Sequence, residues 1–161
     1  MPLEQVQAYF EQAGLGDRVK VLDQSSATVE LAAQALGCQP REIAKTMSFY
    51  LEDGPVLIVT AGDAKIDNRK YKDFFHQKAR MILWEEVEEA VGHAPGGVCP
   101  FARKPGVRAY LDVSLQRFVK VYPAAGSGNS AVELTLAELE EHAGSSGWVD
   151  LCKGWQEEPQ G

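Results

Sequence analysis

The sequence has few cysteines and no long run of apolar residues. Its three cysteines, Cys38, Cys99 and Cys152, are odd in number, far apart and without the paired spacing of a zinc site. This argues against a disulfide framework and against a bound metal or other cofactor, and it suits a reducing cytoplasm. No apolar stretch approaches the roughly 20 residues that cross a membrane. The first 15 residues include two glutamates, unlike a signal peptide, so we expect a cytoplasmic protein without a membrane partner.

Positive charge is also scarce. The chain of 161 residues has 16 lysines and arginines against 23 acidic residues, a net charge of −7. Because nucleic-acid binding draws on cationic surface, this balance disfavours DNA as a partner. However, 11 of the 16 basic residues lie between Asp63 and Lys120. A local basic face on an acidic protein is one interpretation, and an ordinary mixed-charge surface is the other.

Signals for helices and strands alternate irregularly along the chain. The continuous apolar run Val56–Val59 predicts a central strand covered on both faces, joined to a strand over Met47–Leu51 by a tight turn. Thr28 and Gly37 have the residue types that begin and end a helix. We predict an α+β fold in a single domain over residues 1–161, with a loose tail from about residue 153.

Glycine and proline are unusually dense over residues 92–101, which contain three glycines and two prolines. A plain connector needs one such residue, whereas glycines let backbone approach a ligand and prolines hold a loop in shape. We interpret Gly96 to Pro100 as a rigid backbone wall of an active site; a long surface loop is the alternative. A second glycine-rich loop occupies residues 123–130.

These segments, taken in order, resemble the YbaK/prolyl-tRNA-synthetase-associated domain family, whose members hydrolyse mischarged aminoacyl-tRNA. The resemblance extends from about Ser26 to Leu139. It rests on residues 28–30, 33–37, 43–46, 62–63, 65–67, 96–101, 110–112, 114–115, 126 and 132–134. It implies a mixed, partly barrel-like sheet flanked by helices. It also implies an aminoacyl-tRNA deacylase that acts in trans on a mischarged tRNA carrying a small amino acid. The ribose hydroxyl of the substrate would assist the hydrolysis.

The resemblance and the residue types together predict the site. The expected catalytic residues are Lys45, Gly96, Gly97 and Pro100. Lys45 would bind a phosphate or the ester oxygen, and backbone N–H groups of the glycines would stabilise the developing oxyanion. The expected substrate-binding residues are Val29, Met47, Val98 and Gly126. The expected contacts to the 3′ acceptor end of tRNA are Lys65, Arg69, Lys70 and Arg103.

Two positions depart from the family pattern. Members that remove cysteine from tRNA carry a serine and an aspartate around the second glycine loop, where this chain has Ala124 and Ala131. The departure disfavours cysteinyl-tRNA as the substrate. It leaves open which amino acid and which tRNA are recognised.

Two other functions remain as alternatives. The chain could be a non-catalytic module of the same fold that binds tRNA or an aminoacyl-tRNA synthetase. Alternatively, His93 could activate Cys99 as the nucleophile of a thiol hydrolase, although no orienting acid is evident.

Overall fold

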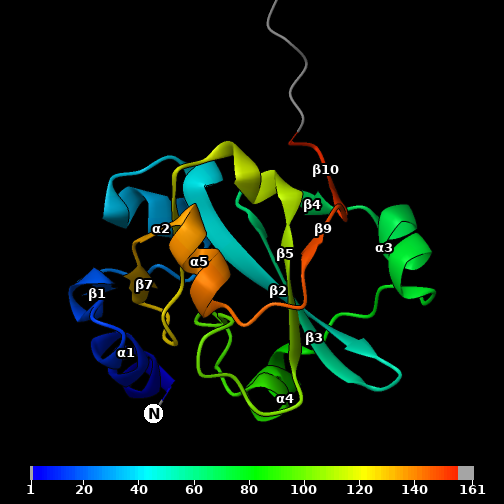
Figure 1. The fold of residues 1–161 in the computed structure, drawn as a ribbon, viewed down its shortest axis with the longest axis horizontal. Helices are drawn as coiled ribbons and strands as arrows, with labels where there is room; N and C mark the ends of the chain where they lie inside the picture. The colour runs from blue at the N-terminus through cyan, green and yellow to red at the C-terminus, as the bar shows by residue number, and fades with distance from the viewer. Residues whose placement is uncertain (1, 156–161) are drawn as a thin grey trace, which may run out of the picture.

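The computed structural model describes residues 2–155 (Figure 1). A six-stranded mixed sheet, with strand order β8-β6-β2-β3-β5-β9, forms the centre of the molecule. Its strands are β2 (Ile43–Leu51), β3 (Gly54–Ala61), β5 (Arg108–Asp112), β6 (Lys120–Pro123), β8 (Leu134–Thr135) and β9 (Trp148–Val149). The sheet curls into a partial barrel with helices around it, which confirms the predicted α+β class.

The β2–β3 hairpin is the longest paired unit of the sheet. Leu51 lies opposite Gly54, so only Glu52 and Asp53 form the turn. β3 also pairs in parallel with β5, and Val56–Val59 is completely buried. The continuous apolar run therefore does form a central strand, because a strand with neighbours on both edges and cover on both faces has no position for a polar side chain.

The structure has five α-helices within residues 2–155, and α2 begins and ends at the expected capping residues. They are α1 (Pro2–Gln12), α2 (Val29–Leu36), α3 (Asn68–Phe75), α4 (Val87–Val91) and α5 (Leu136–His142), with short 3-10 turns η1 (Gly16–Arg18), η2 (Pro40–Glu42), η3 (Trp84–Glu86) and η4 (Val113–Arg117). The Thr28 hydroxyl accepts a hydrogen bond from the Leu31 amide, and Gly37 ends α2 with a φ of 72°.

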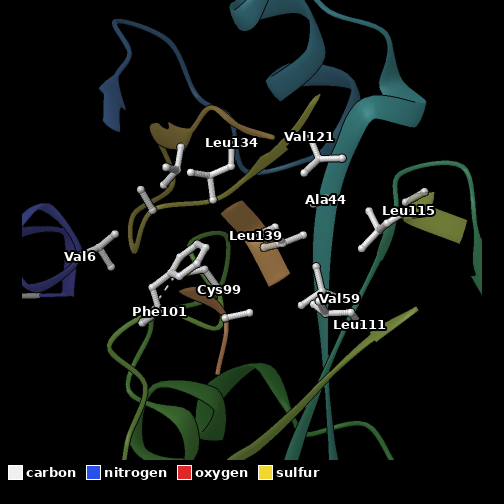
Figure 2. Packing of buried hydrophobic residues seen from close by; sticks show 14 of the residues in the cluster. Val6, Ala44, Val59, Cys99, Phe101, Leu111, Leu115, Val121, Leu134 and Leu139 are labelled. Carbon is white, nitrogen blue, oxygen red and sulfur yellow. Dashed lines mark hydrogen bonds between the residues drawn. The ribbon is translucent and has the colours of Figure 1, made fainter. Parts of the chain in front are cut away.

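The largest hydrophobic cluster joins α1, the sheet, α5 and the first glycine-rich loop (Figure 2). Phe101 enters this cluster from the end of that loop, and its ring meets the ring of Phe10 edge-on with 4.8 Å between centroids. Both side chains are buried. The loop is thus anchored in the core at its C-terminal end, which restricts the positions of the glycines before it.

Two short ladders complete the fold: β1 (Val19–Val21) with β7 (Ser130–Val132), and β4 (Lys65–Ile66) with β10 (Cys152–Lys153). The second corrects the prediction of a loose tail from residue 153, because Lys153 pairs with Lys65 and the ring of Trp155 stacks on Arg117. The rest of the predicted tail, residues 156–161, lies outside the described residues. Among residues 2–155 there is no helix with the length and apolarity to cross a bilayer.

Candidate functional site

A cavity of about 160 Å³ lies between α2, the start of β2 and both glycine-rich loops. Its lining comes from four separated parts of the chain: residues 26–29 with 32, residues 43–46, residues 96 and 98, and residues 122, 124, 130 and 131. Lys45, Gly96, Val29 and Val98 are among them, so the structure brings together four of the predicted site residues.

Lys45 is half-buried at this cavity and lacks a direct partner. Its side chain makes no hydrogen bond or ion pair with any residue between 2 and 155. Burial lowers its pKa, and Cys152 and Asp63 oppose that shift in part. An ammonium that is removed from water without a fixed counter-ion favours an anionic or strongly polar ligand.

Two residues of the loop before Pro100, Gly96 and Val98, line the cavity. The amides of these two residues have no hydrogen-bond acceptor within the described part of the chain. By contrast, the Gly97 amide donates to the carbonyl of Ala94 at 3.0 Å. The Gly97 amide is thus already occupied, whereas the role of Gly96 as an oxyanion donor stays a prediction.

Gly97 contributes by allowing a close approach between the two loops. A Cβ atom at Gly97 would lie 2.4 Å from the amide nitrogen of Ser127. Gly96 needs its freedom for a different reason, a φ of 89° that disfavours any side chain. The density of glycine in this loop thus has two separate physical causes.

Three other predicted site residues lie outside the cavity lining. Met47 packs against the hydrophobic cluster that includes Phe49 and Tyr71. Pro100 is buried, and its carbonyl accepts a hydrogen bond from Arg103. Gly126 approaches the N-terminus of α1 so closely that a Cβ atom would lie 2.8 Å from the Pro2 carbonyl carbon. The positions beside Gly126 that do reach the cavity are Ala124 and Ala131, which face each other across an isolated antiparallel bridge.

The four predicted tRNA contacts divide into two pairs. Lys65 and Arg69 are exposed, and within residues 2–155 neither side chain has a hydrogen-bonded or ionic partner. Lys70 instead donates to the Asp150 carboxylate at 3.0 Å and to the Cys152 carbonyl at 2.9 Å.

Arg103 serves the fold in a way the sequence did not predict. Its guanidinium donates to four backbone carbonyls, those of Pro100, Val107, Ala143 and Gly144. It therefore joins the first glycine-rich loop to the end of α5. Contacting an external phosphate would require breaking these bonds, so Arg103 is not retained as a tRNA contact.

The geometry of His93 and Cys99 contradicts the thiol-hydrolase alternative. His93 Nε2 lies 2.7 Å from the Phe101 carbonyl oxygen, which can only accept, so this nitrogen carries the proton. Cys99 Sγ lies 3.6 Å from the same nitrogen, which cannot then act as its base. Both side chains are completely buried. Burial also raises the pKa of Cys99 to about 12 and lowers that of His93.

Thr46 is a cavity residue whose importance the sequence did not reveal. Its hydroxyl is buried and unpartnered within the described residues. The outer edge of β2 pairs with β6 only at Ile43–Ala44 and with the segment after α3 only from Ser48 onward. Because alternate residues direct their backbone groups to the same edge, the Thr46 amide and carbonyl lie in the unpaired gap. The sequence feature that could have identified Thr46 as a cavity residue is its position directly after Lys45.

Comparison with known proteins agrees with this architecture. Residues 23–142 match the model of the aminoacyl-tRNA editing domain. The chain is 50% identical to the uncharacterized protein YwhH of Bacillus subtilis, over 97% of this chain and all of that protein. It is 26% identical to the proline–tRNA ligase of Bacillus licheniformis, over 88% of this chain but only 24% of the ligase.

A solved structure of similar size has the same fold. A protein provisionally described as a trans-editing enzyme for prolyl tRNA synthetase superposes with a TM-score of 0.84 at 32% identity. The match covers 95% of this chain and 98% of that one. With the cavity, the fold and the matched domain model in agreement, the chain belongs to the aminoacyl-tRNA editing domain family.

Proposed function

We propose that this protein hydrolyses, in trans, the ester bond of a mischarged aminoacyl-tRNA that carries a small amino acid. The observation that carries the proposal is the arrangement of one cavity. An unneutralised Lys45 and the free amides of Gly96 and Val98 line the same small space. A cation and two backbone donors suit a reaction in which negative charge develops on an ester carbonyl.

The proposed chemistry needs no nucleophile from the protein. Water adds to the ester carbon and gives a proton to the neighbouring ribose hydroxyl, which passes its own proton toward the ribose oxygen of the ester. The amides of Gly96 and Val98 hold the carbonyl oxygen as it becomes negative. The ester C–O bond then breaks, and the ribose oxygen leaves with a proton relayed through the same hydroxyl. Lys45 binds the phosphate or ester oxygens of the terminal nucleotide and keeps the ester against the loop.

The size of the cavity supports a small amino acid. A volume of about 160 Å³ corresponds to roughly five water molecules, well below the ~300–1,000 Å³ of typical ligand pockets. Five of the lining residues are alanines: Ala27, Ala32, Ala44, Ala124 and Ala131. A larger cognate side chain would be excluded by overlap with backbone, whereas discrimination between small side chains would reach only ~1–3 kcal/mol per methylene.

The relatives suggest the first tRNA to test. One is a proline–tRNA ligase and another is described as a trans-editing enzyme for prolyl tRNA synthetase. We therefore propose tRNA for proline as the primary substrate, with a prolyl-tRNA synthetase as a candidate partner and the cytoplasm as the place of action.

The test is a deacylation assay on tRNA for proline charged with alanine, serine, threonine or cysteine. We expect turnover of at least one of these by the wild-type protein, and loss of most of it in Lys45→Ala with an unchanged melting temperature. Lys20→Ala, at an exposed lysine of β1, is the matched control and should keep full activity. Full activity in Lys45→Ala would overturn the proposed site. Tight binding of charged tRNA without turnover would favour the non-catalytic module.

A further inference from the structure

Two lysines face each other across the β4–β10 ladder. Lys65 is the direct cross-strand partner of Lys153, and both side chains are exposed. Like charges placed directly opposite each other destabilise a strand pair. Within residues 2–155, neither lysine side chain has a hydrogen bond or ion pair. The ladder therefore pairs two like charges, and Asp67, on whose pKa the charge of Lys153 acts, offsets part of this repulsion.

The carboxylates around this ladder are already engaged. Asp63 forms two hydrogen bonds with Arg117, at 2.6 and 3.0 Å. Asp67 accepts from the amides of Arg69 and Lys70 at the start of α3. Asp150 accepts from the side chain of Lys70.

Arg69 is exposed in the first turn of α3, two residues after the capping residue Asp67. We call Lys65, Lys153 and Arg69 the basic ridge. It is a local excess of positive charge on a chain with a net charge of −7.

The basic ridge is adjacent to the cavity. Lys45 lies near enough to Lys65 and Asp63 for their charges to act on its ammonium. In Figure 1, β4 and β10 lie at the upper end of the sheet, on the side toward α3. Cys152, next to Lys153 in β10, is close enough to Lys45 and to Lys70 for both charges to act on it, which links the cavity to the start of α3.

We propose that the basic ridge is the docking surface for the phosphodiesters that precede the terminal ribose of the substrate RNA. This inference rests on the proposed function, which places the terminal ribose and its ester at the cavity. The nucleotides before it leave the cavity as a single strand, whose phosphates are the anions that this ridge lacks. Phosphate contacts of this kind position an RNA without reading its sequence. Phosphates of the bound RNA would thus neutralise the like charges of Lys65 and Lys153.

The test measures binding of an uncharged RNA hairpin that ends in a single-stranded CCA, by fluorescence anisotropy between 50 and 200 mM KCl. For a single strand, each lost phosphate contact reduces the slope of log K against log salt by about 0.7. The double variant Lys65→Gln/Lys153→Gln should therefore have a slope smaller by about 1.4. Between 50 and 200 mM KCl, the fold-loss of affinity should therefore be about seven times larger for the wild type than for the variant.

The control removes the same charge elsewhere. Lys20→Gln/Lys104→Gln changes one exposed lysine on β1 and one beside α4, and should keep the wild-type slope. An unchanged slope in Lys65→Gln/Lys153→Gln, or an equal loss in the control, would overturn the proposal. The melting temperature of the ridge variant at low salt should be at least that of the wild type, since a repulsion is removed.

A second substrate separates this inference from the proposed function. Aminoacyl-adenosine has the ester and the ribose but no preceding phosphodiester. The ridge variant should hydrolyse aminoacyl-adenosine at the wild-type rate but lose activity on aminoacyl-tRNA. An equal loss of activity on the two substrates would overturn the proposed role of the basic ridge. If the wild type hydrolyses neither substrate, the proposed function fails, whereas the hairpin measurement still decides the ridge.

Discussion

The carbonyl oxygen of Gly97 accepts a hydrogen bond from the amide of Gly126, with 3.1 Å between the two atoms. The two glycine-rich loops are therefore in direct backbone contact. Gly126 lies between the first loop and the start of α1, outside the cavity lining. This contact holds Gly96 and Val98 at the cavity.

Gly97→Ala should separate the loops. The new Cβ atom would lie 2.4 Å from the Ser127 amide nitrogen, a backbone atom that cannot rotate away. We expect a loss of about 1–3 kcal/mol in the free energy of unfolding, measured with urea, and a lower deacylation rate. Gly128→Ala is the control, because its Cβ atom would meet only Ala27 Cβ at an ordinary 3.8 Å. Equal stability of the two variants would contradict this account of the contact.

Arg117→Ala should cost more stability than Arg108→Ala, although both arginines pair with an aspartate. Arg117 binds Asp63 with two hydrogen bonds and lies over the rings of Phe118 and Trp155. Arg108 has a single, more exposed contact with Asp53. We expect losses of about 1–3 kcal/mol for Arg117→Ala and under about 1 kcal/mol for Arg108→Ala in urea unfolding. A larger loss for Arg108→Ala than for Arg117→Ala would show that the two hydrogen bonds between Arg117 and Asp63 contribute little to stability.

Lys45→Met should leave the protein as stable as the wild type, or more stable, at pH 7. Burial lowers the pKa of Lys45 from its ordinary value of 10.5, so the folded state releases this proton before the unfolded chain does. Below the lowered pKa the buried charge reduces stability, and this cost is relieved as pH rises from that pKa toward 10.5. The stability gap between Lys45→Met and wild type should therefore narrow on going from pH 7 into the alkaline range.

Thermal melts across pH 7 to 10 test this, with Lys20→Met as the control at an exposed position. The control should show no gap of this kind. A melting temperature several degrees below wild type for Lys45→Met at pH 7 would mean that Lys45 stabilises the fold, contrary to its lack of partners in the described chain.

Cys99 should resist alkylation in the native protein. It is completely buried, and burial raises its pKa to about 12, so almost no thiolate is present at pH 7.5. Mass spectrometry after iodoacetamide treatment should find Cys99 unmodified in native protein and modified after unfolding in urea. Cys99→Ala should keep its deacylation activity. Rapid native labelling together with loss of activity would restore the thiol-hydrolase alternative.

Much of the local structure was predictable because local chemistry determines it. Thr28 and Gly37 end α2 as expected, since a hydroxyl that accepts an amide and a residue that tolerates positive φ need no distant partner. Val56–Val59 revealed a central strand by its unbroken apolar run. Lys45, Gly96 and Val98 were found from their motifs, and the cavity brings them together.

Other predictions failed where distant contacts decide the role of a residue. Arg103 has the composition of a phosphate contact, yet four carbonyls from two segments bind its guanidinium. Met47 lies only two residues from Lys45 but packs into a separate hydrophobic cluster. An arginine or a methionine can either bind a ligand or stabilise the fold, and its neighbours in space determine which of the two roles it has.

The sequence by itself determined the fold class, the main capped helices, the central hairpin and the family. Each of these follows from patterns within short stretches of chain or from their order. Only the tertiary structure decided that Gly126 supports Gly97, that the amide of the cavity residue Val98 has no acceptor among residues 2–155, and that Lys153 lies opposite Lys65. These relations join residues 29 or more positions apart or depend on which amides lack an acceptor. The long-range pairs and the amides without an acceptor both arise from packing and hydrogen bonding between distant parts of the chain, which no short stretch of sequence specifies.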